Sequence, residues 1–348
     1  MHDARCLNAK ASAWLASLMM VILVAGCGGG GGDSGGNTVT PASVTDNSTN
    51  VPAGTITEAG APLATGVMAT DGFNWFNFRR QQMGLAALAR NTQIDKAASN
   101  HSNYQALNDT ITHVEISGKP GFTGVDLYPD SGDASKFVDG VPVPGSSRFA
   151  AAGYVFPKSN YAYGEVISAT ADTNGVSAAE DLITAIYHRF VVFEPKFLET
   201  GAASATAGSG YTYFTTDFAT RTLDQGGLGT GRLVTYPFKG QQNLPVVFYS
   251  DQEQPDPVPD RNEVGYPVSV HADITSVLTV QSFTISPHGG AALTTKLLRY
   301  GTDPEINRPS VAAIIPLAVL QAQSVYDVRF VGSVDGVPVT LAWSFKTR

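Results

Sequence analysis

The sequence has very little cysteine, with two residues of this type among 348. Cys6 lies near the N-terminus, ahead of an apolar segment that Cys27 ends. We expect Cys6 to leave with a cleaved leader and Cys27 to be modified. The mature fold would then hold neither a disulfide nor a reactive thiolate, which excludes disulfide-stapled scaffolds and cysteine-dependent catalysis.

Positive charge is also sparse. The chain has 22 Lys and Arg against 30 Asp and Glu, a formal net charge of -8, and no block of basic residues. Proteins that bind nucleic acid need such a block to contact phosphates, so we expect no nucleic-acid partner. The sequence also has no His-Glu-x-x-His pattern and no phosphate-binding Gly-Lys-Ser/Thr loop, which argues against two common enzyme classes.

The N-terminus has the three parts of a secretory signal. Arg5 and Lys10 supply positive charge, residues 11–25 form an apolar run, and small residues precede Cys27. The run is shorter than the roughly 18–20 residues that a membrane-spanning helix needs. The ending Leu23-Val24-Ala25-Gly26-Cys27 resembles a bacterial lipobox.

This resemblance implies an exported protein, lipid-anchored in the bacterial cell envelope, whose membrane partner is reached through acylated Cys27. Gly28 rather than Asp follows the cysteine, which in sorted lipoproteins of two-membrane bacteria implies the outer membrane. A signal peptide without lipid attachment, or a membrane anchor, is the alternative.

Composition divides the chain into four segments. Residues 1–27 are the leader, and residues 28–64 are a glycine-rich, weakly apolar stretch that we interpret as a flexible tether. Residues 65–222 form a first domain and residues 232–348 a second. The glycines of residues 226–231 predict a flexible joint between them.

Helix signals alternate with loops at the start of the first domain. Asp71 is suited to cap an aromatic-rich helix that ends near Gly84. A second helix follows Thr92, which forms a capping-box pattern with Asp95. These two helices, with the elements that follow, predict an α/β domain.

The rest of the first domain has a third helix and a strand. Ser177 and Glu180 form a second capping-box pattern, and Pro195 lies at or just past the end of this helix. Residues 111–153 are rich in Gly, Pro, Ser and Asp and predict long loops. Residues 211–215 are aromatic and β-branched and predict a strand.

The second domain shows short strand-like runs separated by turn signals, without helical periodicity. This texture predicts an all-β sandwich. Examples of these runs are 233–236, 245–249, 268–272, 277–285, 326–331 and 337–345.

Several short motifs occur in one order between residues 70 and 220. They are Asn77-x-x-Arg80-x-x-x-Gly84-Leu85-x-x-Leu88, Ala98-Ser99-Asn100-His101, Thr112-His113, Arg148-Phe149-Ala150-Ala151-Ala152-Gly153-Tyr154, Gly164-Glu165-Val166 and His188-Arg189. Together they resemble the CAP superfamily of cysteine-rich secretory, antigen five and pathogenesis-related proteins. The resemblance implies a three-layer α-β-α sandwich with a cleft lined by histidines and acidic residues.

The resemblance implies that His113, Glu165 and His188 line this cleft. Imidazole nitrogens and a carboxylate suit zinc, so zinc at His113 and His188 is the candidate cofactor. The same groups would also suit proton transfer. Val166 stands where the family has Asn, which removes a polar contact beside Glu165, and no fourth, acidic member of the cleft is evident.

Other polar residues have simpler interpretations. Glu180 fits a fourth cleft position, but its place in a capping box favours a structural role, and Glu115 and Glu194 are weaker candidates. His101 shares a helix face with apolar residues and is expected in the core. Arg189 is expected to bind carbonyls or a carboxylate.

Two acidic stretches are expected to be exposed. Asp126, Asp130 and Asp133 share a loop but lack the ligand pattern of a calcium loop, so we expect a solvated loop. Residues 251–263 are acidic and rich in proline, which predicts a stiff exposed loop.

Three functions remain open. The favoured one is a binding protein whose cleft holds a small molecule, a lipid or a divalent metal. A metal-assisted or acid-base hydrolase of envelope or extracellular polymers is the first alternative. Adhesion is the second, because residues 232–348 resemble bacterial immunoglobulin-like modules, notably at Trp343-Ser344-Phe345. The sequence names no nucleophile and no oligomeric state.

Overall fold

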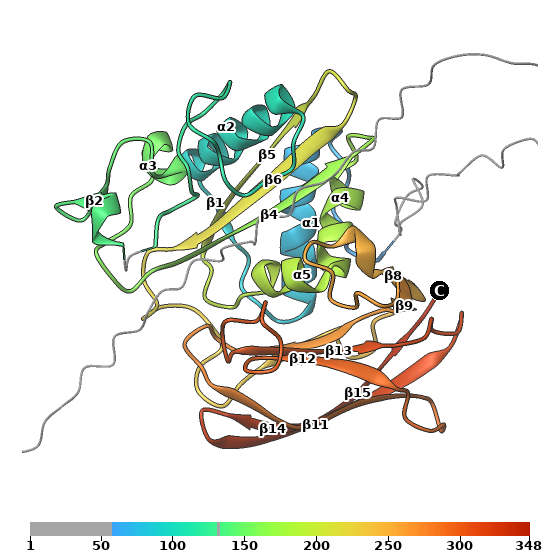
Figure 1. Cartoon of the computed structure of the whole chain (residues 1–348). Helices are drawn as coiled ribbons and strands as arrows, with labels where there is room; N and C mark the ends of the chain where they lie inside the picture. The colour runs from blue at the N-terminus through green and yellow to red at the C-terminus, as the bar shows by residue number, and fades with distance from the viewer. Residues whose placement is uncertain (1–57, 131–132) are drawn as a thin grey trace, which may run out of the picture.

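A four-stranded sheet forms the centre of the first domain (Figure 1). The computed structural model describes residues 58–130 and 133–348, so the predicted leader, Cys27 and most of the predicted tether lie outside the described residues. The sheet order is β1 (Ala89–Arg90), β5 (Glu199–Thr206), β6 (Thr212–Thr220) and β4 (Ala162–Thr170). Strand β1 pairs parallel with β5, and the other pairs are antiparallel.

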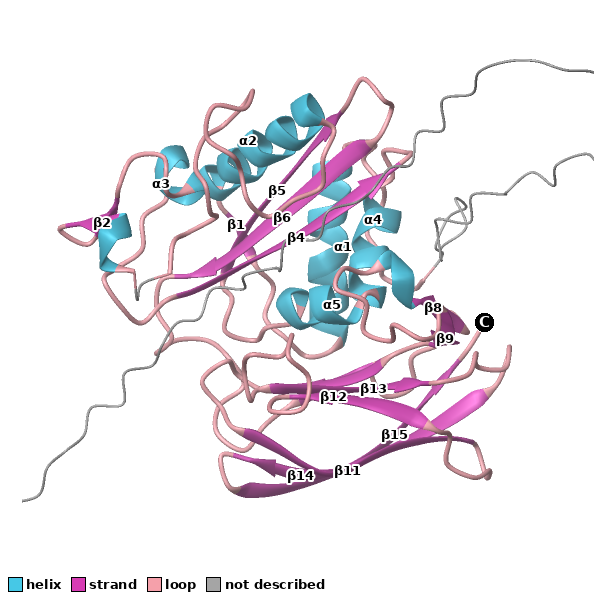
Figure 2. Cartoon of the chain, viewed as in Figure 1, coloured by secondary structure: helices cyan, strands magenta, loops and turns pink. Residues whose placement is uncertain are grey.

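Helices cover both faces of this sheet (Figure 2). One layer holds α2 (Thr92–Asn108) and α3 (Arg148–Ala152), and the other holds α1 (Met68–Gln82), α4 (Gly175–Thr184) and α5 (Ile186–Val192). Ser102 of α2 donates to Thr215 of β6 at 3.0 Å. Phe76 of α1 packs edge-on against the opposite face, its ring centroid 5.9 Å from that of Phe218. Both layers are thus fixed to the sheet by side-chain contacts.

The predicted loops between α2 and β4 hold little regular structure. They contain a single 3-10 turn, η1 (Ala134–Lys136), a short hairpin of β2 (Phe137–Val138) and β3 (Val141–Pro142), and α3. In the described part of the chain, no helix is long and apolar enough to cross a membrane.

The predicted helix caps at Asp71 and Thr92 are wrong. Helix α1 begins before Asp71, whose carboxylate reaches back to accept from the backbone N–H of Thr65 at 2.7 Å. Asn91 caps α2 by accepting from the N–H groups of the next turn. An Asn side chain at this position satisfies the free N–H groups, which leaves Asp95 to accept from Ala202 N at 3.0 Å and so hold α2 against β5.

The predicted third helix is two helices, and its capping box is also wrong. Asn174 caps α4, accepting from Val176 N and Ser177 N at 3.1 Å each. The chain leaves helical geometry at Ala185, with φ -65° and ψ 119°, before α5 begins. Pro195 lies just past α5, where it was expected.

The second domain contains two antiparallel sheets and a small hairpin. The first sheet has the order β12 (Thr295–Arg299), β13 (Val311–Pro316), β10 (Val268–His271) and β7 (Val234–Tyr236). The second has the order β11 (Leu278–Pro287), β14 (Val325–Val334) and β15 (Val337–Lys346). The hairpin pairs β8 (Val247–Tyr249) with β9 (Glu263–Gly265), and the turn η2 (Ser250–Gln252) follows β8.

The four-stranded sheet of the second domain packs against both its partner sheet and helix α5. Ala312 and Ile314 of β13 share a core with Phe330 of the other sheet. Ala313, one residue along the same strand, shares a core with Phe190 of α5. Strand β13 is therefore buried on both faces, and it joins the two domains (Figure 1).

The glycine-rich joint is tied down rather than free. The Asp273 carboxylate accepts from Leu228 N at 2.6 Å and from Gly229 N at 2.9 Å. Lys196 donates to the carbonyl of Gly226 at 3.0 Å. A buried carboxylate of the second domain thus binds the backbone of the glycine-rich joint.

Candidate functional site

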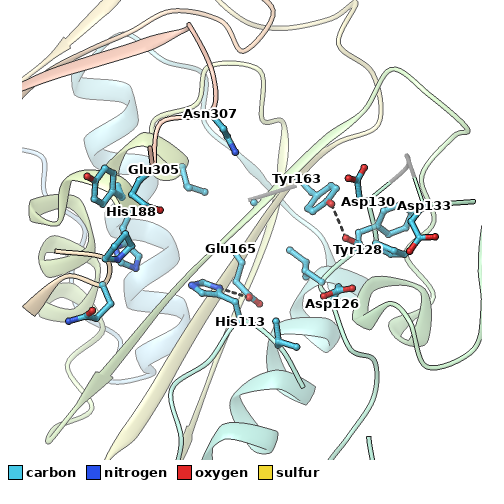
Figure 3. Close-up of a pocket in the computed structure, with 18 of the residues that line it drawn as sticks. His113, Asp126, Tyr128, Asp130, Asp133, Tyr163, Glu165, His188, Glu305 and Asn307 are labelled. Carbon is cyan, nitrogen blue, oxygen red and sulfur yellow. Dashed lines mark hydrogen bonds and ion pairs between the residues drawn. The ribbon is translucent and has the colours of Figure 1, made fainter. Parts of the chain in front are cut away.

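His113 and Glu165 meet where the loop after α2 crosses strand β4. Nδ1 of His113 lies 2.8 Å from Oε1 of Glu165, and Figure 3 shows the two joined at the centre of the pocket. The imidazole remains 28% exposed at its side chain, against 4% for Glu165. Because an ionised carboxylate only accepts, Nδ1 carries the proton, and Nε2 is left as the acceptor.

Arg148, the first residue of α3, holds Glu165 in its ionised form. Its Nη2 lies 2.7 Å from each oxygen of Glu165, and its Nη1 donates to the His113 carbonyl at 2.8 Å. Burial by itself raises the pKa of Glu165, but the Arg148 guanidinium, His101 and the hydrogen bond from His113 together outweigh burial, and the pKa lies well below its usual range.

A second buried carboxyl group lies beside Glu165. Asp217 of β6 stands directly opposite Glu165 of β4 in the sheet register, and it is fully buried. Burial, and then the negative charge of Glu165, raise the pKa of Asp217 well above its ordinary value. The neutral form of Asp217 is therefore favoured beside the ionised carboxylate of Glu165.

His188 reaches the same cavity from α5. Its Nδ1 lies 3.1 Å from Oε1 of Glu253, a residue of the second domain. Gly164 lets α5 come this close to β4, because a Cβ at that position would lie 2.6 Å from Cγ1 of Val191. His188 thus has the arrangement of His113, with Nδ1 bound to a carboxylate.

The three residues named from the sequence line one cavity of about 310 Å³. Figure 3 shows His188 and Glu305 on one side and Asp130, Asp133 and Tyr128 on the other, with the His113–Glu165 pair between them. The described carboxylate-bearing residues of the lining outnumber its basic ones. The acidic residues are Asp126, Asp130, Asp133, Glu165 and Glu305, and Lys136 is the lysine among them.

Aromatic and amide groups complete the lining. The tyrosines Tyr128, Tyr163 and Tyr187 contribute to it, and Tyr163 is fixed by donating to the carbonyl of Tyr128 at 2.8 Å. Gln254 and Asn307 of the second domain supply amides. No serine, threonine or cysteine is among the described lining residues.

The other sequence candidates lie elsewhere. His101 is fully buried, with its ring nitrogens 2.9 Å from Glu115 and 2.6 Å from the Thr112 carbonyl, which confirms it as a core histidine. Glu180 is not a capping acid, because it accepts from Trp75 Nε1 at 2.5 Å and from Arg79 Nε at 3.0 Å between α1 and α4.

Arg189 and Glu194 also act within the fold. Arg189 donates to the Ile183 and Pro267 carbonyls, as expected. Glu194 is buried and accepts from Ile274 N of the second domain at 3.0 Å. Burial raises the pKa of Glu194 to about 7.

Two predictions of exposed acidic loops are wrong in part. Asp126, Asp130 and Asp133 border the cavity instead of lying in a loop that faces only solvent. Glu253, in the acidic proline-rich segment, is 1% exposed because its carboxylate binds α5. The only signal for Arg148 was its place at the head of an apolar, alanine-rich motif.

The described residues do not form a closed metal site. Within residues 58–130 and 133–348, no group of three or more His, Cys, Asp or Glu side chains is placed to hold a metal ion. A zinc ion would have Nε2 of His113 and Nε2 of His188 as its nitrogen donors, since each Nδ1 is bound to a carboxylate. Val166, at the position of the family's Asn, points into the apolar core.

Residues 73–218 match the model of CAP, the cysteine-rich secretory protein family. The chain therefore contains a CAP domain, and the resemblance found over residues 70–220 is confirmed. A search of the curated proteins finds no match.

Two solved structures are similar to part of the chain. An extracellular protein containing an SCP domain from Bacillus anthracis is 20% identical over 45% of this chain and 44% of its own, with a TM-score of 0.32. This chain thus spans less than half of that protein. An outer surface protein from Borrelia burgdorferi is 14% identical over 43% of this chain and 90% of its own, with a TM-score of 0.31. Scores this low carry no argument about function.

Proposed function

We propose that this protein is an exported binding protein whose CAP-domain cavity holds a small polar ligand with positive charge, a divalent metal ion being one candidate. The observation that carries the proposal is that His113, Glu165 and His188, from three separate segments, line one cavity with both imidazoles bound through Nδ1 to carboxylates. Both rings thus offer an unprotonated Nε2, the form that binds a metal or accepts a hydrogen bond.

The charges around the cavity favour a cation over a lipid chain. Arg148 balances the charge of Glu165, and the other lining acids, which include Asp126, Asp133 and Glu305, outnumber Lys136. An acyl chain would gain little from such walls, because removing carboxylates from water without a partner is costly. Tyrosine faces beside the carboxylates also suit a cation.

Calorimetric titration of zinc into residues 28–348 tests the metal form of the proposal. We expect stoichiometric binding that is lost in the double variant His113→Ala/His188→Ala. His288→Ala is the matched control, since that imidazole is exposed in the second domain. Absence of binding to the parent chain would contradict the zinc proposal and leave the cavity as a metal-free pocket.

Paired small molecules test the charge argument. Thermal unfolding of residues 28–348 is measured with an amino sugar and with its acetylated, neutral counterpart. We expect the amine alone to raise the midpoint, and the shift to vanish in Glu305→Gln. Equal shifts with both compounds, or a shift with long-chain fatty acids instead, would contradict the proposed ligand class.

Acid-base hydrolysis is the second candidate, because both histidines have the carboxylate-bound Nδ1 of a general base. Since the described lining offers no serine, threonine or cysteine as a nucleophile, such an enzyme would activate a water molecule. Release of soluble fragments from envelope polysaccharide by the parent, lost in His113→Ala, would favour this candidate over binding alone.

The lipid anchor at Cys27 and the outer-membrane location rest on the sequence of the leader. We expect incorporation of labelled palmitate into the expressed chain, its loss in Cys27→Ala, and recovery of the parent in the outer-membrane fraction. Secretion of unlabelled parent chain into the medium would contradict the anchor.

The strand order supports an immunoglobulin-like second domain. With the β8–β9 hairpin set aside as an insertion, the seven other strands are A to G in chain order, and the sheets are A-B-E-D and C-F-G. That is the order of constant-type immunoglobulin domains. If the second domain is adhesive, a chain with mutated cavity residues should still bind to a surface.

A further inference from the structure

One carboxylate of the second domain enters the first domain at the start of α5. Glu253 follows η2 and accepts from the backbone N–H groups of Ile186 at 2.7 Å, Tyr187 at 2.6 Å and His188 at 3.2 Å. The same carboxylate lies 3.1 Å from Nδ1 of His188. A buried carboxylate is stable only when such donors surround it.

The second domain also supplies part of the cavity wall. Gln254 and Pro255 follow Glu253 directly, and Glu305 and Asn307 belong to the loop between β12 and β13. That loop is held to α5, because the Tyr187 hydroxyl donates to Asp303 at 2.9 Å. Both loops thus meet the first domain at the helix that carries His188.

We propose that the binding site is shared between the two domains and that Glu253 is a positioning residue for His188. A neutral imidazole in water exchanges its proton between its two nitrogens. Glu253 accepts hydrogen bonds on both oxygens, so it presents no proton to Nδ1 and requires Nδ1 to be the donor. In the neutral ring of His188, Nε2 is thereby the unprotonated nitrogen.

The two histidines give the proposal an internal comparison. His113 is oriented by Glu165 from within the CAP domain, whereas His188 is oriented by a residue 65 positions away in the next domain. Removing the second carboxylate should therefore release one imidazole and leave the other as it was. The tautomer of His188 does not depend on a bound ligand. Only the role of Glu253 in ligand binding rests on the proposed function.

The test is nitrogen-15 NMR of the imidazoles in residues 28–348, at a pH of about 8.5, roughly two units above the ordinary imidazole pKa of about 6.5. We expect separate resonances for a protonated Nδ1 and an unprotonated Nε2 in both His113 and His188 of the parent. In Glu253→Gln, the His188 pair should move together toward the values of exchanging tautomers, with His113 unchanged. Glu263→Gln, an exposed residue of the same hairpin, is the matched control.

Several results would overturn the proposal. The proposal is wrong if the spectrum of the parent chain shows the proton of His188 on Nε2. This measurement needs no variant, so it remains available if Glu253→Gln fails to fold. An unchanged His188 spectrum in a folded Glu253→Gln chain also overturns the proposal. For zinc as the probe, loss of such an orienting partner typically weakens binding by about 10- to 100-fold, and equal affinity of parent and Glu253→Gln would overturn the role in binding. If zinc does not bind the parent at all, the zinc proposal fails while the tautomer result still decides the role of Glu253.

Discussion

The two domains bury their ionisable side chains in different places. In the CAP domain, buried ionic pairs lie within the domain itself, Arg148 with Glu165 at the sheet and Arg79 with Glu180 between α1 and α4. In the second domain, four buried residues with carboxylate or imidazole side chains face outward to the first domain or to the joint. They are Glu253, His271, Asp273 and Asp303.

This difference indicates what the second domain does. An independent module attached by a flexible linker has no need to bury charge on the surface that faces its neighbour, because each buried charge is costly unless it is paired. Here each of these carboxylates has a partner in the first domain or the joint. The second domain is thus built as a support for α5 and the cavity.

The largest expected effect comes from Phe190→Ala on α5. Phe190 is 1% exposed and lies in the core shared with β13, so its loss should cost about 3–5 kcal/mol of unfolding free energy. Phe283→Ala, within the sandwich, is the matched control and should cost a similar amount. Urea unfolding measures both, with Trp75 and Trp343 as fluorescent probes in the two domains.

The outcome for Phe190 decides whether the interface is a core. A cost below about 1 kcal/mol, the range of surface substitutions and minor contacts, would mean that the domains only touch. The same conclusion would follow if the fluorescence of Trp75 and that of Trp343 reported unfolding of the two domains of the parent chain at different urea concentrations.

The next effect is a pH dependence from Glu194 at the interface. Burial raises its pKa in the folded chain to about 7, from 4.5. Between these values the folded state binds the proton more tightly, so the stability that Glu194 contributes is full below about pH 4.5 and declines as the pH rises to 7. At about 1.4 kcal/mol per pH unit, the decline is on the order of 3 kcal/mol.

Glu194→Gln isolates this contribution. The variant should show a flatter stability curve than the parent over that pH window, measured by urea unfolding at several pH values. Parallel curves for parent and variant would show that Glu194 titrates normally, and that the interface does not keep water from it.

A smaller effect is expected from Asp273→Ala at the joint. The change removes the acceptor of Leu228 N and Gly229 N, and unpaired buried donors cost about 1–3 kcal/mol. Limited proteolysis should cut residues 226–231 faster than in the parent. An unchanged cleavage rate would indicate that the joint is held by other contacts.

The smallest effect is expected on the sheet that faces away from the CAP domain. His288 and Asp327 form a pair 2.9 Å apart, but their side chains are 75% and 43% exposed. His288→Ala should change the unfolding free energy by no more than about 0.5 kcal/mol. A larger loss of unfolding free energy, measured with urea, would mean that ionic pairs on this face also stabilise the fold. The two sides of the domain would then differ less than proposed.

Local signals in the sequence predicted the presence of helices and strands better than they predicted where those elements begin and end. The helices near residues 71, 92 and 177 exist, but Asn91 and Asn174 cap two of them in place of the predicted Thr92 and Ser177. Neighbouring polar residues compete for the same N–H groups, and the winner depends on how the chain enters the helix. The doubly buried strand β13 was not among the predicted runs, although its uninterrupted apolar sequence is typical of such a strand.

The sequence by itself displayed the CAP motifs, and it predicted the order of the two domains and the three residues His113, Glu165 and His188 that line one cavity. These depend on residue type and spacing along the chain, which a sequence displays directly. Only the tertiary structure decided that Arg148 binds Glu165, that Asp217 is buried opposite Glu165, and that Glu253 of the second domain contacts His188. Such pairings depend on which distant segments share a water-excluded space, since burial sets both the protonation of a carboxyl group and its choice of partner.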